Sequence, residues 1–187
     1  LTGTTLTNQH QMMKVILLLA ALLVAGAVGS GTTPEQIHLS LTDKPDEMTV
    51  MWTTMSDVSS PTVRFGLSAK ALTSNQGAYD NNHYAWLDLY VSGQIHTARL
   101  TGLKGNSTYF YQVGDTATNT WSEVFSFNTV RARPIRILIT GDVGVAPESK
   151  KVMDAFSTVH KKMPIDFVMH SGDISYANGE QPYWDEW

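Results

Sequence analysis

Two aspartates that each follow a glycine offer the clearest chemistry in this sequence of 187 residues. Asp142 comes shortly after the run Ile-Leu-Ile-Thr, and Asp173 comes shortly after the run Phe-Val-Met-His. Nearly continuous apolar runs of this length are typical of strands buried in a parallel sheet. Paired strands lie about 4.8 Å apart, so carboxylates at their ends could share two metal ions roughly 3.5–4 Å apart. Asp142 and Asp173 are therefore candidate metal ligands.

The elements that must position these carboxylates are a strand, a helix and a second strand. Strands are expected around 135–139 and 165–169, with a helix over 147–163 that has proline at its first position. Such a unit is a right-handed crossover, which brings both Gly-Asp turns to the carboxyl edge of one parallel sheet. Outside that context a Gly-Asp pair indicates only a turn, and we interpret the third pair, Gly114-Asp115, in that way.

Residues 34–133 instead alternate apolar and polar side chains with the period of a β-strand. Met48, Val50 and Trp52 are one such set. Further strands are expected at 62–65, 86–91, 109–113 and 124–127, separated by turns such as 75–77. Several short strands at this spacing predict a β-sandwich.

The segment 100–113 resembles the part of fibronectin type III domains in which a tyrosine near the start of a strand bonds back to the preceding corner. Tyr109 would be that tyrosine, although Gly105 stands where that family usually has proline. The expected fold is thus an all-β, fibronectin type III-like sandwich over 34–133. The first βαβ unit of an α/β domain follows it over 134–187.

The region before the sandwich has the pattern of a secretory leader. Met12, Met13 and Lys14 precede an uncharged apolar run over 15–28, and small residues follow it. This pattern predicts a signal peptide over 12–29, with cleavage after Ala27 or Gly29 both open. Residues 1–11 are interpreted as pre-leader sequence outside the native start. The expected destination is extracellular or lumenal.

Composition excludes several classes of protein. With 13 Lys and Arg against 17 Asp and Glu, the formal charge of −4 argues against nucleic-acid binding. The content of 42% hydrophobic and 10% aromatic residues argues against a disordered chain. Because cysteine is absent, any metal must be held by oxygen or nitrogen ligands. The leader is too short to span a bilayer, and no span is expected after it is removed.

The second turn, Gly-Asp-Ile-Ser-Tyr-Ala from Gly172, resembles the purple acid phosphatase branch of the calcineurin-like metallophosphoesterases. The resemblance implies that Asp142 and Tyr176 bind a ferric ion and that Asp173 bridges it to a divalent Zn, Fe or Mn ion. It also implies a fibronectin-type sandwich ahead of the catalytic domain. Without it, Tyr176 would be interpreted as an aromatic residue packed under a loop.

The resemblance further implies an acid phosphatase that hydrolyses phosphate monoesters and could form a homodimer. The Asn and His ligands that complete the family's site do not occur in this sequence, so we expect an inactive N-terminal fragment of a longer enzyme. The five histidines that follow the leader are interpreted as structural or surface residues, and His170 as a core histidine. They are His38, His83, His96, His160 and His170.

Two alternatives remain open at this stage. A secreted metallophosphoesterase that acts on phosphodiesters or nucleotides would share every residue named above. A non-catalytic secreted β-sandwich protein is the alternative from another class. In each case Asn106, in the sequence Asn-Ser-Thr within an expected turn, is a candidate for N-glycosylation.

Overall fold

The computed structural model describes residues 31–87, 89–129 and 134–187. The expected pre-leader segment 1–11 and signal peptide 12–29 lie outside the described residues. Within those ranges, no helix has the length and apolar character needed to cross a bilayer.

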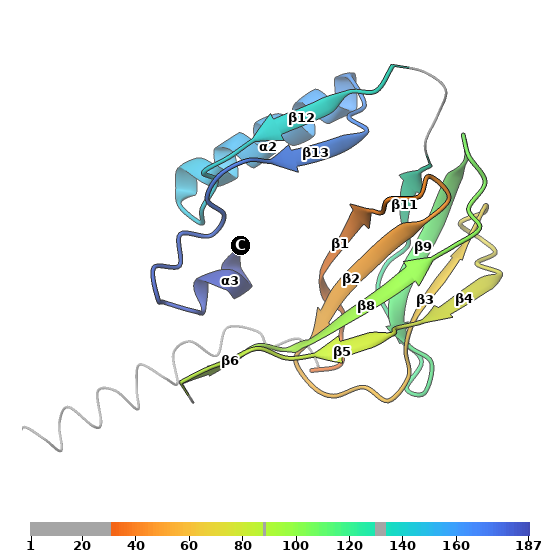
Figure 1. Ribbon diagram of the computed structural model, residues 1–187, viewed down its shortest axis with the longest axis horizontal. Coiled ribbons are helices and arrows are strands. Elements are labelled where there is room, and N and C mark those ends of the chain that lie inside the picture. Colours follow the sequence, from red (N-terminus) through yellow and green to blue (C-terminus); the bar gives the residue numbers. More distant parts are fainter. Residues whose placement is uncertain (1–30, 88, 130–133) are drawn as a thin grey trace, which may run out of the picture.

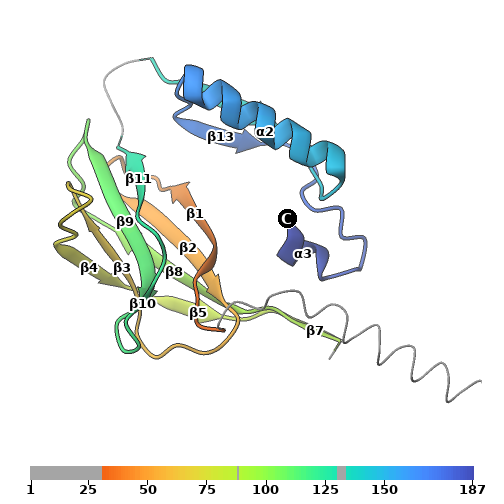
Figure 2. The ribbon, with the colours of Figure 1, turned by 180° about the vertical axis from the view of Figure 1, so that it is seen from behind.

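Two antiparallel sheets pack face to face and form the predicted sandwich (Figures 1 and 2). In the first sheet the strand order is β1-β2-β8-β5, and in the second it is β10-β9-β3-β4, with β11 also paired to β9. The strands are β1 (Glu35–Leu41), β2 (Met48–Thr54), β3 (Pro61–Gly66), β4 (Ser74–Gly77), β5 (Asp80–Asn82), β8 (Gln94–Leu100), β9 (Thr108–Asp115), β10 (Thr120–Trp121) and β11 (Phe125–Asn128). This arrangement confirms the sandwich.

The core lies between the two sheets and follows the alternation seen in the sequence. Val50 and Trp52 of β2 are 0% and 1% exposed, and Val63 and Val113 face them from the second sheet with 0% exposure. Alternate residues of a strand point to opposite faces, so a period of two buries one face of each sheet. Apolar burial of this kind is the main force that stabilises the sandwich.

Two expectations for the sandwich are wrong, and some of its strands were not predicted. The run 86–91 is not one strand but the hairpin of β6 (Ala85–Trp86) and β7 (Tyr90–Val91), closed by a hydrogen bond from the Leu89 amide to the Trp86 carbonyl. Residues 75–77, expected as a turn, lie in β4 and pair with β3. Strands β1, β5, β8 and β10 were not predicted. In β8, buried His96 and Thr97 interrupt the apolar pattern.

His96 is buried because its polar atoms are satisfied within the sandwich. Its Nε2 lies 2.8 Å from the Thr54 hydroxyl, and its Nδ1 lies 2.7 Å from the Asn81 amide oxygen. Burial lowers the pKa of His96, so the ring stays neutral. This environment fits the structural role expected for it.

Tyr109 occupies the corner that the sequence predicts. Its buried ring stacks on Phe127, with 5.8 Å between ring centroids, and its hydroxyl oxygen accepts a hydrogen bond of 3.0 Å from the Lys104 amide. The corner assignment is therefore confirmed. The third Gly-Asp pair is the end of β9, paired with β10, and the turn follows it over 116–119. Asp115 is structural, since its buried carboxylate accepts hydrogen bonds from the Ser60 and Thr118 amides.

The chain after the sandwich forms the predicted βαβ unit. β12 (Ile137–Thr140) pairs in parallel with β13 (Phe167–His170), and α2 (Pro147–Lys162) connects them. Proline stands in the first turn of α2, and the amide of Met163 caps its end on the Val159 carbonyl. A short helix, α3 (Tyr183–Glu186), ends the chain.

The expectation that these strands are buried on both faces is wrong for this chain. Ile139 is 66% exposed and Val168 is 57% exposed. Both views show α2 alongside the strand pair (Figures 1 and 2), and α2 itself has no buried residue. Two strands and one helix provide too little surface to enclose the apolar side chains that the sequence places there.

Tyr109→Phe tests the corner. Removing the hydroxyl leaves the Lys104 amide without this acceptor, which costs about 1 kcal/mol. In a domain of this size, a loss of 1 kcal/mol lowers the melting temperature by roughly 4–8 °C, and we expect a fall of that order for Tyr109→Phe. Thermal unfolding followed by circular dichroism measures the change. Tyr79→Phe, on an exposed tyrosine of the same sandwich, is the control and should not shift the transition; equal shifts would contradict the role of the corner.

Candidate metal centre

The two Gly-Asp loops leave the same edge of the β12–β13 pair. Thr140 and His170 are partners in the parallel register, so both strands end at one level. The amide of Ser171 donates to the Thr140 carbonyl at 2.6 Å, and the amide of Val143 donates to the Asp173 carbonyl at 3.3 Å. The loops are thus bonded to each other along their length.

The glycines serve two different purposes in these loops. Gly172 has φ +115°, which other residues rarely adopt, and a Cβ there would lie 2.9 Å from Oδ1 of Asp142. At Gly141 a Cβ would overlap the carbonyl oxygen of Ser171, so glycine allows the two loops to approach closely. The sharp turn after β12 is made by Asp142 itself, with φ +53°.

These loops bring Asp142, Asp173 and Tyr176 together. The Tyr176 hydroxyl donates to Oδ1 of Asp142 at 2.9 Å, and the Asp173 amide donates to the same oxygen at 3.1 Å. Tyr176 reaches this position with φ +54° and leaves its side chain accessible to solvent. Left-handed backbone at two non-glycine residues is a strain that functional sites often contain.

The contact between Asp142 and Tyr176 shifts the pKa values of the two side chains in opposite directions. The hydrogen bond from Tyr176, followed by the one from the Asp173 amide, lowers the pKa of Asp142. The hydrogen bond to Asp142 raises the pKa of Tyr176. The hydrogen bond between them thus stabilises the folded chain at pH values above the ordinary pKa of an aspartate. This stabilisation is lost as the pH falls through the lowered pKa of Asp142. At the other end, the contribution is lost as pH rises through the raised value of Tyr176.

The chemistry of the donor set fits a hard metal ion. Carboxylate and phenolate oxygens suit such ions, and a bound ion would replace the proton that Tyr176 now donates to Asp142. Within 31–87, 89–129 and 134–187, no group of three or more His, Asp or Glu side chains gathers at one point. Asp142, Asp173 and Tyr176 are therefore candidate ligands, and the tyrosine is the third oxygen donor beside the two aspartates.

The prediction that His170 is a core histidine is wrong. The residue is half-buried at the end of β13, and its Nε2 lies 2.8 Å from the carbonyl oxygen of Asp173. Its ring meets Trp187 edge-on, with 6.0 Å between centroids. His170 thus contacts the backbone of the loop that holds Asp173. Its position in the sequence, three residues before that aspartate, could have indicated this contact.

Ser149 is a second residue that sequence reasoning missed. From the first turn of α2 its hydroxyl donates to the carbonyl oxygen of Val143, next to Asp142. The amide of Gly144 also donates to the Ile174 carbonyl. Helix, first loop and second loop are therefore joined around the three candidate ligands.

The sequence profile described as "Purple acid Phosphatase, N-terminal domain" matches residues 34–129, which is the sandwich. This chain belongs to the purple acid phosphatase family. "Probable purple acid phosphatase 20" of Arabidopsis thaliana is 37% identical over 156 residues, which cover 82% of this chain and 34% of that protein. "Purple acid phosphatase 21" of the same plant is 31% identical over 153 residues, covering 81% and 32%.

Among solved structures, a purple acid phosphatase from yellow lupin seeds has a TM-score of 0.65 and 24% identity. The match covers 82% of this chain and 32% of the lupin chain, and it supports the fold. The chain described here thus spans about a third of the length of these purple acid phosphatases. The profile matches the sandwich alone. The similarity to the first plant protein extends past the sandwich, because a match over 82% of this chain is too long to end at residue 129.

Asp142→Asn tests the coupling within the cluster. In the metal-free chain this change removes the negative charge that holds the Tyr176 proton, so one tyrosine should ionise at lower pH than in the parent chain. The ultraviolet absorbance of ionised tyrosine, followed during alkaline titration, measures this shift. Tyr176→Phe identifies the contribution of that residue. Superimposable curves for the parent chain and Asp142→Asn would contradict the coupling.

Proposed function

We propose that this purple acid phosphatase chain acts as part of a metal-dependent acid phosphatase that hydrolyses phosphate monoesters. The observation that carries the proposal is the convergence of Tyr176 and the Asp173 amide on one oxygen of Asp142. Family membership alone gives the class of enzyme, whereas this contact concerns the residues that would perform the chemistry.

Each residue of the cluster has a distinct role in this proposal. Asp142 and Tyr176 would hold a ferric ion, and Asp173 would bridge it to a divalent Zn, Fe or Mn ion. When bound, such a centre supplies Lewis acidity toward phosphoryl oxygens. The hydrogen bond to Asp142 already holds the Tyr176 oxygen in place. Iron binding would therefore release the Tyr176 proton and require little movement of these two side chains.

The chain would need further ligands to turn over substrate. Its one Gly-Asn pair, Gly105-Asn106, is followed by Ser107 and lies in a turn of the sandwich. A purple acid phosphatase also uses Asn and His ligands beyond those seen here, as the family resemblance implies. We therefore assign residues 34–133 to the sandwich and residues 134–187 to the segment with the first ligands, and we expect no hydrolysis by this chain alone.

Tyr176→Phe in the full-length, iron-loaded protein tests the phenolate assignment. Charge transfer from a tyrosinate to ferric iron would give a visible absorption band, and the variant should lose it because phenylalanine has no donor oxygen. Absorption spectroscopy measures the band, and iron content measured on the same samples shows whether metal is still bound.

Tyr183→Phe is the matched control, since Tyr183 lies seven residues later in α3 and is not part of the cluster. It should keep the band. A band that persists in Tyr176→Phe with iron bound would show that another residue supplies the phenolate or that the metal binds elsewhere.

We also propose that the protein is secreted and glycosylated on Asn106. Asn106 lies exposed in the turn before β9 with φ +53°, and Thr108 completes the sequon at the start of that strand. An exposed turn gives a transferase access to the amide nitrogen, and the apolar leader over 12–29 provides the route to it.

Asn106→Gln should lower the mass of the secreted protein by one glycan, and glycosidase treatment should then leave the mass unchanged. Gel mobility and mass spectrometry of protein from culture medium measure this. Asn119→Gln is the control, because Asn119 is also exposed in a turn with positive φ but begins no sequon. Unmodified Asn106 in secreted protein would overturn the assignment.

A further inference from the structure

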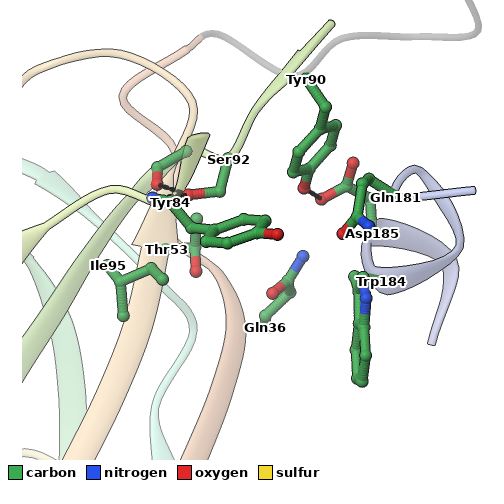
Figure 3. A pocket seen from close by; sticks show the side chains of 10 residues that line it. Gln36, Thr53, Tyr84, Tyr90, Ser92, Ile95, Gln181, Trp184 and Asp185 are labelled. Atoms are coloured by element: carbon green, nitrogen blue, oxygen red, sulfur yellow. Dashed lines mark hydrogen bonds between the residues drawn. The ribbon is translucent and has the colours of Figure 1, made fainter. Parts of the chain in front are cut away.

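A cavity of about 410 Å³ lies between the sandwich and α3, away from the candidate metal centre. Figure 3 shows Tyr84 and Tyr90 from the hairpin region, Trp184 and Asp185 from α3, and Gln36 from β1 around it. We call it the aromatic cavity. Its volume lies within the range of about 300–1,000 Å³ that is usual for small-molecule sites.

Hydrogen bonds fix the Tyr90 side chain and the backbone at Tyr84 beside the cavity. The Tyr90 hydroxyl donates to Oδ1 of Asp185 at 2.8 Å, joining residues far apart in the sequence. The amide of Tyr84 donates to the Ser92 hydroxyl at 2.9 Å. The rings of Tyr84 and Tyr90 are tilted by 50° with 6.4 Å between centroids, so they form two inclined walls of one space.

The cavity has one acidic side chain and no basic one. Asp185 provides the carboxylate, and among the residues that the structure describes no Lys, Arg or His lines the space. Burial first, and then the hydrogen bond to Asp185, raise the pKa of Tyr90 to about 12. Tyr90 therefore remains a neutral donor at physiological pH, and the charge of the cavity is that of Asp185.

This combination selects for a positive ligand. The faces of tyrosine and tryptophan rings attract cations, and alkylated ammonium groups are the ligands that aromatic cages bind best. A carboxylate adds attraction for the same charge and repels phosphate and other anions. A sugar would instead need a hydrogen-bonding partner for each hydroxyl, and most of the wall is ring and aliphatic carbon, including Ile95.

We propose that the aromatic cavity binds an organic cation that carries a quaternary or other alkylated ammonium group. The ammonium group lies against Tyr84, Tyr90 and Trp184 with Asp185 as its counter-ion. Gln36 lies beside this space (Figure 3) and can bond to a hydroxyl or ester oxygen on the rest of the ligand. No residue of the candidate metal centre lines the cavity, so the proposal is independent of the phosphatase assignment.

Binding of choline to the 187-residue chain, measured by isothermal titration calorimetry and ligand-observed NMR, tests the proposal. The neutral probe 3,3-dimethylbutan-1-ol has the shape of choline without its charge, and methyl glucoside represents a polyol. Choline should bind at least about fivefold more tightly than either. Each cation–π contact at such sites is worth a factor of about two to thirty in affinity, so Tyr84→Leu and Trp184→Leu should weaken binding by that range.

Asp185→Asn is the sharpest variant, because the amide keeps the size of the side chain and can still accept the Tyr90 hydrogen bond. It should weaken the binding of choline and leave the affinity for the neutral probe unchanged. Tyr79→Leu, on an exposed tyrosine outside the cavity, is the matched control and should bind choline as the parent chain does. Circular dichroism of each variant verifies folding.

Three results would overturn the proposal. Equal affinity for choline and its neutral analogue would mean that the cavity is merely apolar. Tighter binding of methyl glucoside would indicate a carbohydrate site. No binding of choline to the folded parent chain would show that the aromatic cavity is not a site for organic cations.

Discussion

The parallel pairing of β12 with β13 is the constraint on which the candidate metal centre depends. Because Thr140 lies opposite His170, both strands end together and their loops leave the sheet side by side. Only then can the backbone after Gly172 donate to Asp142 and Tyr176 reach the same carboxylate. A change of register by one residue would turn the side chains to the other face and separate the cluster.

The sandwich contributes most of the packed interior, and the βαβ unit carries the candidate metal ligands. Fully enclosed apolar side chains such as Trp52, Val63 and Leu100 belong to the sandwich. The two parts also meet directly, because Tyr90 of the hairpin bonds to Asp185 of α3. In this purple acid phosphatase chain the sandwich region thus contacts the segment that follows Tyr176.

Local patterns in the sequence were sufficient for much of the fold and of the cluster. The alternation around Val50 and the proline that begins α2 are short-range signals, and both were predicted correctly. β8 escaped detection because His96 is satisfied by Thr54 and Asn81, which no local pattern reveals. The hairpin was missed because Leu87 takes φ +49° without glycine. The contact of Tyr90 with Asp185 spans residues that only the folded chain brings together.

The uncovered faces of β12 and β13 have a practical consequence for handling the chain. In the part that the structure describes, each of these strands pairs only with the other, which leaves an open edge on both sides. Ile139, Val168 and Met169 are exposed beside those edges. Open strand edges next to apolar side chains promote association between copies. The stability of the fold should therefore depend mainly on the sandwich. Association between copies at high concentration should depend on the βαβ unit.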